Sequence, residues 1–136
     1  MSIDLKLGFK NKPEDLEATL KKKKFKHVSS LVEEDGRTYA LPPKISRQIN
    51  DNEIRLKIYR LSPGIHFSYS KNIENDSNWP DIIKEHNLDV NIIAEGSLSV
   101  VGNDADYQRT LDIGRFLRDR YSTILYDPQT DQVIKD

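Results

Sequence analysis

Apolar and polar residues alternate along several short segments of the chain, a pattern typical of strands with one buried face. The alternation is clearest over residues 3–9, 54–59 and 65–70. In the second of these segments it puts Ile58 on the buried side and Tyr59 on the polar side. We therefore expect Ile58 to share one core with Leu5 of the first strand and Leu111 of the last helix.

Turn residues separate the other extended segments. Asp35-Gly36 is a strong signal for a tight hairpin between strands 25–32 and 37–41, and residues 62–64 predict a second hairpin. Further strands are expected over residues 88–101, 122–126 and 132–134.

Apolar residues spaced three and four positions apart predict three helices, over residues 14–24, 79–86 and 104–121. Lys21 to Lys24 stand at the end of the first helix, where cations are favoured by the helix dipole. Asn103 is expected to cap the last helix, and a single helical turn is expected around Ile45 and Ile49.

Hairpins with helices inserted singly indicate an α+β fold with a mostly antiparallel sheet. The chain of 136 residues has the usual length of one domain, so we expect a single α+β domain over residues 1–136. The expected architecture is a two-layer sandwich, ferredoxin-like with an extra hairpin, in which two main helices cover one face of the sheet. The other face is expected to be wet, because most strands alternate.

Composition narrows the function. The net charge is −1, which offers no overall basic excess for nucleic acid, and the absence of cysteine excludes disulfides and thiolate metal sites. The first residues alternate and so do not resemble a signal peptide, and no apolar run is long enough for a membrane span. We expect a soluble, cytoplasmic protein with no membrane association.

The sequence carries no recognised catalytic motif. The three histidines, His27, His66 and His86, lack the spacing of a metal site, and the glycines form no phosphate-binding loop. We therefore expect no cofactor and no metal, and a binding role is favoured over an enzymatic one.

Three surfaces are candidates for binding, and each has a plainer explanation. Trp79 follows the polar loop 72–78, which we expect to be mobile, and it lies near Tyr69, as a binding anchor would. Tryptophans at helix starts are nevertheless usually core residues. Arg115 and Arg118 belong to an arginine-rich helix face that suits an acidic partner or simple internal pairing. The lysine run, Lys21 to Lys24 with Lys26, suits an acidic partner or the end of a helix.

The leading hypothesis is a non-catalytic protein-interaction module, such as an immunity- or regulator-type inhibitor of another protein. Partner binding would use Tyr69, Trp79, Arg115 and Arg118. The alternative is a small-molecule or anion sensor, or an enzyme, with a cleft between sheet and helices lined by His66, Tyr69 and Trp79. Self-association through an exposed strand edge is a third hypothesis.

Overall fold

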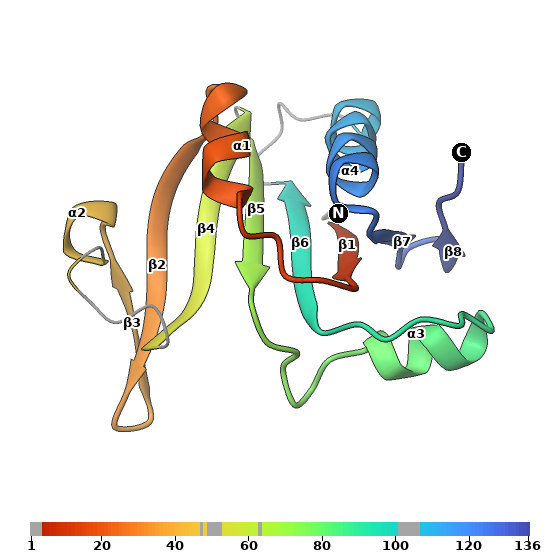
Figure 1. Cartoon of the computed structure of the whole chain (residues 1–136), viewed down its shortest axis with the longest axis horizontal. Coiled ribbons are helices and arrows are strands. Elements are labelled where there is room, and N and C mark those ends of the chain that lie inside the picture. The colour runs from red at the N-terminus through yellow and green to blue at the C-terminus, as the bar shows by residue number, and fades with distance from the viewer. Residues whose placement is uncertain (1–3, 47, 49–52, 63, 101–106) are drawn as a thin grey trace.

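The computed structural model describes residues 4–46, 48, 53–62, 64–100 and 107–136. Within these residues eight strands form one sheet (Figure 1). The strands are β1 (Asp4–Phe9), β2 (Lys26–Glu34), β3 (Arg37–Leu41), β4 (Ile54–Ser62), β5 (Ile65–Ser70), β6 (Ala94–Val100), β7 (Ile124–Asp127) and β8 (Gln132–Val133). The helices are α1 (Leu16–Lys22), α2 (Pro43–Ser46), α3 (Trp79–Glu85) and α4 (Tyr107–Tyr121).

The sheet has the order β3-β2-β4-β5-β6-β1-β7-β8, and its neighbouring strands pair antiparallel. The mixed α+β class and the antiparallel sheet are therefore confirmed. A ferredoxin-like sandwich is not confirmed, because β1 pairs antiparallel with β6 where that fold has a parallel pair, and because the sheet is large relative to its helices. None of the helices in the described part of the chain is long and apolar enough to cross a membrane.

The tight turn between β2 and β3 forms as its residues predict. Asp35 and Gly36 both have positive φ, 53° and 77°, as the two central residues of a type I′ hairpin require. The predicted hairpin of β4 and β5 also forms. The predicted turn at Ile45 corresponds to α2, whereas Ile49 and Asn103 lie outside the described residues.

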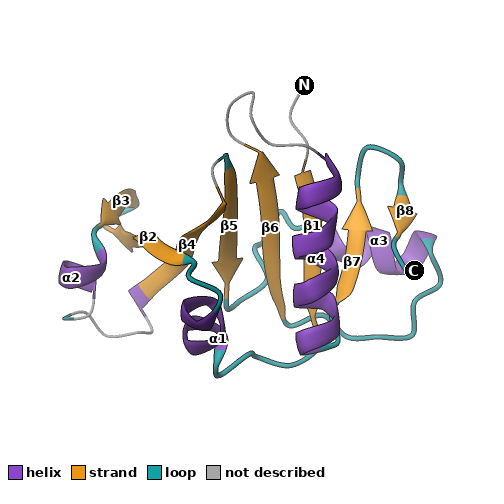
Figure 2. Ribbon diagram, turned by 90° about the horizontal axis from the view of Figure 1, so that it is seen from above, coloured by secondary structure: helices purple, strands orange, loops and turns teal. Residues whose placement is uncertain are grey.

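The main core lies between the sheet and the pair α1 and α4, which share one side of the sheet (Figure 2). Leu5 and Leu111 both belong to this core, as predicted. Ile58 does not, so the prediction that all three share one interior is wrong.

Strand β4 has the opposite orientation to the predicted one. Tyr59 pairs with Phe67 and is buried in the main core, while Ile58 pairs with Ser68 on the other face. The strand extends to Leu61, which is buried on the same side as Tyr59. Tyr59 and Leu61, near the end of the strand, thus decide which face of β4 is buried in the main core. They prevail over the earlier isoleucines because Tyr59 lies opposite Phe67 of that core.

A second, smaller core lies on the other face of the sheet, so the prediction that this whole face is exposed to solvent is wrong. Trp79 and Ile82 of α3 pack there with Ile92 and Tyr126, and α3 lies on the side of the sheet opposite α1 and α4 (Figure 2). Gly8 of β1 makes room for this layer, because a Cβ there would lie 3.0 Å from the Trp79 ring.

The predicted long strand over residues 88–101 begins only at Ala94. The segment before it runs irregularly from α3 back to the sheet, and Leu88 and Val90 pack against the second core with the buried Ile92. The apolar residues of this segment therefore serve as a cover for α3 and β7, which alternation along the chain does not distinguish from a strand.

Candidate functional site

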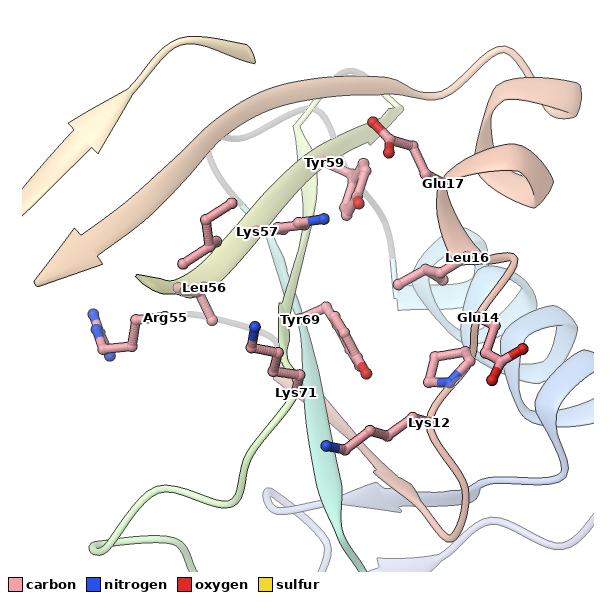
Figure 3. A pocket seen from close by; sticks show the side chains of 12 residues that line it. Lys12, Glu14, Leu16, Glu17, Arg55, Leu56, Lys57, Tyr59, Tyr69 and Lys71 are labelled. Atoms are coloured by element: carbon pink, nitrogen blue, oxygen red, sulfur yellow. The ribbon is translucent and has the colours of Figure 1, made fainter. Parts of the chain in front are cut away.

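Two adjoining pockets lie beside α1, on the face of the sheet that α1 and α4 cover. One, of about 240 Å³, lies between the start of α1 and strands β4 and β5 (Figure 3). The other, of about 490 Å³, lies between the end of α1, the start of β2 and α2. Glu17 and Tyr59 line both pockets, so we treat them as one depression, the α1 groove.

Lysines and arginine dominate the rim of the α1 groove. The first pocket is lined by Lys12, Arg55, Lys57 and Lys71, and the second by Lys21, Lys24 and Lys26. Against these seven cations stand two acids, Glu14 and Glu17. In a chain with a net charge of −1, positive charge is therefore concentrated along this groove.

Arg55 is paired within the chain. The Arg55 guanidinium lies 3.3 Å from Glu33 and 3.1 Å from Glu74, both carboxylates outside the groove lining. Apart from Arg55, the groove is lined by six lysines and two glutamates.

The orientation of β4 places two of the groove residues. Lys57 and Tyr59 lie on the same side of β4 and line the groove, and Lys57 pairs across the sheet with Tyr69 of β5. In Figure 3 the side chains of Lys12, Lys57 and Lys71 lie around the ring of Tyr69. That ring stands edge-on to Phe9, with the centroids 5.3 Å apart, so the core below holds it in place.

His27 stabilises the wall shared by the two pockets. Its Nε2 lies 3.0 Å from the carbonyl oxygen of Ser29 and 3.1 Å from Oγ of Ser30, and its ring lies over Tyr59 with the centroids 5.1 Å apart. Its Nδ1 is 3.7 Å from a carboxylate oxygen of Glu17. The histidine thus joins β2 to α1 and holds Glu17 at the middle of the groove.

Trp79 lies away from the groove, on the opposite face. It is 2% exposed and belongs to the second core, where its ring stands edge-on to Tyr126. Its position agrees with the plainer explanation given by the sequence, a core residue at a helix start.

The loop before Trp79 is anchored, which the sequence did not predict. Glu95 of β6 accepts hydrogen bonds from the backbone N–H of Glu74 at 3.3 Å and from the Ser77 hydroxyl at 2.8 Å. The Ser77 hydroxyl oxygen in turn accepts from the N–H of Trp79, and Ser70 donates to the carbonyl oxygen of Asn72. These bonds fix Glu74 and Ser77 of the loop to β6.

The structure does not bring His66, Tyr69 and Trp79 together. Alternation along β5 puts His66 and Tyr69 on opposite faces of the sheet, and the cross-strand partners of His66 are Arg60 and Ser99. A cleft lined by all three side chains is therefore absent. Of the three, Tyr69 alone lines the groove between sheet and helix.

Arg115 and Arg118 hold the last residues of the chain against α4. Arg115 donates to the backbone and side-chain oxygens of Asp136, and Arg118 donates to the carbonyl oxygens of Ile134 and Asp136. Arg115 also lies 3.7 Å from Asp112, the internal pair that the sequence predicted. Both arginines thus make the intramolecular contacts given above as the alternative to partner binding.

Sequence reasoning found part of the groove. It identified the lysine run and Tyr69, but not Lys12, Lys57 or Lys71, which come from three other segments. For these three lysines the sequence offers one indication, the position of Lys57 opposite Tyr69 of β5. That position can be recognised only once the register of the β4–β5 hairpin is known.

The fold and the groove define an α+β protein with an eight-stranded antiparallel sheet and a basic depression beside its first helix. Comparison of the chain with protein-family models, with curated proteins and with solved structures finds no match.

Proposed function

We propose that this chain is a non-catalytic protein-interaction module that binds an acidic segment of a partner protein in the α1 groove. The observation that carries the proposal is the charge along the groove, where six lysines face two glutamates. Positive charge gathered in a depression attracts and orients an acidic partner, and it raises the rate of association. A regulator- or immunity-type inhibitor would use such a surface, because it needs complementarity rather than a reactive centre.

The floor of the groove favours a polypeptide. The partly exposed Phe25 lines the second pocket with the lysines, so acidic side chains can pair with the lysines while an apolar one contacts the Phe25 ring. Single-stranded nucleic acid would need fully exposed ring faces for stacking, whereas Tyr59 is 2% exposed and Tyr69 and Phe25 are only partly exposed.

The first pocket of the groove, which Tyr69 lines, supports a second candidate function, the binding of a small anion. The lysines around Tyr69 lie between the sheet and α1, where the sequence placed the cleft of a sensor or enzyme. A small anion would engage the first pocket alone, whereas an acidic polypeptide would also engage the lysines at the end of α1.

Charge reversal in each pocket tests the proposal. The probe is a fluorescent poly-glutamate peptide, followed by anisotropy at low salt. We expect Lys21→Glu with Lys24→Glu, and separately Lys57→Glu with Lys71→Glu, to weaken binding about tenfold or more, because each reversal replaces an attraction by a repulsion. The matched control reverses Lys10 and Lys84, two exposed lysines outside the groove.

The outcomes separate the candidates. Loss of peptide binding in both groove variants, with the control unchanged, supports an acidic polypeptide. If only the Lys57 and Lys71 variant responds, and pyrophosphate competes for the site, the small-anion function holds instead. Equal binding by all variants contradicts both functions, and tighter binding of an oligonucleotide than of the peptide contradicts the choice of a protein partner.

A further inference from the structure

Three side chains with metal-binding atoms meet far from the α1 groove, where the end of α3 approaches the turn between β7 and β8. The side-chain ligand atoms of Glu85, His86 and Asp131 all lie within 4.8 Å of one another. Nε2 of His86 is 3.0 Å from Oδ1 of Asp131, although these residues are 45 positions apart in the chain.

The second core holds two of these side chains in place. Tyr126 donates a hydrogen bond of 2.5 Å to Oδ1 of Asp131, and the His86 ring stands edge-on to Tyr126 with centroids 5.7 Å apart. Tyr126 itself is buried against Trp79. A carboxylate and an imidazole fixed by their neighbours are preorganised as ligands, and hydrogen bonds to a ligating carboxylate tune its affinity for metal.

The electrostatics favour a cation in this position. The Asp131 carboxylate accepts a hydrogen bond from the Tyr126 hydroxyl, and its Oδ1 lies 3.0 Å from Nε2 of His86. With Glu85 it supplies two negative charges beside one imidazole. Lys135 lines the adjoining pocket with His86 and Asp131, and its charge opposes a cation there. The balance of these charges is still negative.

We propose that Glu85, His86 and Asp131 form a site for a divalent transition metal ion such as Zn²⁺. An imidazole with two carboxylates suits Zn²⁺, Co²⁺ or Ni²⁺ rather than Mg²⁺ or Ca²⁺, which prefer oxygen ligands alone. Ligands at about 2.0–2.1 Å from a tetrahedral ion lie about 3.4 Å apart, which a small rotation of the exposed Glu85 side chain achieves. The adjoining pocket of about 380 Å³ has room for the water that completes the coordination. A bound ion would join α3 to the β7–β8 turn.

The competing explanation is that His86, Asp131 and Tyr126 form only a hydrogen-bonded latch. Glu85 distinguishes the two, because it lies outside the hydrogen bonds that join those three residues. Glu85→Gln removes a charged ligand and leaves the latch intact. It should therefore weaken metal binding without changing the stability of the metal-free protein.

The test is titration of the chelator-treated 136-residue chain with ZnCl₂ by calorimetry, and with CoCl₂ by visible absorption. We expect one saturable site, a Zn²⁺-dependent rise in Tm, and loss of saturable binding in His86→Ala. His66→Ala is the matched control, since His66 lies on β5 outside this cluster. In Glu85→Gln and Tyr126→Phe, both folded, binding should weaken about tenfold or more.

Two results overturn the proposal. One is the absence of saturable binding by the wild-type chain, which would leave the latch as the whole explanation. The other is wild-type affinity in both His86→Ala and Glu85→Gln, which would place the ion elsewhere. Because poly-glutamate binding at the α1 groove is measured separately, failure of either proposal leaves the other standing.

Discussion

The two ends of the sheet are covered differently. At the β1–β7 end, α4 covers one face and α3 the other, and two cores meet back to back across the strands. At the β2–β3 end, coverage is thinner, and three of the exposed large apolar side chains, Val28, Tyr39 and Ile45, lie on β2, β3 and α2. The α1 groove also reaches this end.

This difference separates stability from binding. At the doubly covered end the buried Asp127 accepts hydrogen bonds from the Tyr107 hydroxyl and the Gln129 N–H. At the thinly covered end, cationic and apolar side chains line a surface depression. We therefore expect substitutions in the buried cores of the first end to change the free energy of unfolding, and substitutions in the groove at the second to change binding of an acidic polypeptide.

The largest expected effect on stability is that of Trp79→Ala. Removal of the largest side chain of the second core should cost about 3–5 kcal/mol in the free energy of unfolding, measured by urea denaturation. The matched comparison is Tyr39→Ala at the other end, where the side chain is 44% exposed and the cost should stay within about 0.5 kcal/mol. Similar losses in the two variants would contradict the proposed division.

An intermediate effect is expected for Gly96→Ala at the centre of the sheet. A Cβ at Gly96 would lie 2.5 Å from Cε1 of Phe67, inside the main core. Overpacking should cost about 1–3 kcal/mol, again by urea denaturation. Ser97→Ala, on the opposite face of the same strand, is the control and should be nearly neutral. A neutral Gly96→Ala would show that Phe67 moves aside freely.

A smaller effect is expected for Tyr107→Phe, which removes the hydrogen bond of 2.8 Å to the buried Asp127 at a cost of about 1 kcal/mol. That hydrogen bond, with burial, raises the pKa of Tyr107 in the folded chain. Its contribution is therefore fully present below the ordinary tyrosine pKa and is lost as the pH rises through the raised value. Unfolding free energies that diverge between wild type and Tyr107→Phe below pH 9 but converge at higher pH would confirm this sign. A constant difference across that range would contradict it.

The smallest effect is expected at the exposed edge of the sheet. Among the described strands, β3 has a neighbour, β2, on one side only, so its other edge is a candidate for pairing with a second copy. If the chain self-associates there, Tyr39→Lys should shift the mass found by light scattering towards the monomer. A wild-type chain that is monomeric at high concentration would remove the self-association hypothesis.

The sequence predicted the order of elements well, because short-range patterns determine it. The Asp35-Gly36 turn, α1, α3 and the hairpins all form near their expected positions. The face of β4 was mistaken because apolar residues occupy both of its parities. Only the pairing of Tyr59 with Phe67 decides which side is buried.

The candidate site was predictable only in part, for a related reason. The lysine run is continuous in sequence, whereas Lys12, Lys57 and Lys71 join it through the packing of α1 on β4 and β5. The cluster of Glu85, His86 and Asp131 likewise depends on contact between α3 and the β7–β8 turn. Spacing within a helix or strand carries no information on such long-range encounters.

The most direct test of the central claim is an NMR titration of the ¹⁵N-labelled chain with poly-glutamate peptide. We predict saturable amide shifts at Lys21, Lys24, Lys57 and Lys71, with α3 and β7 unchanged. Shifts that centre on the doubly covered end, or no saturable shifts at low salt, would contradict the assignment of binding to the α1 groove.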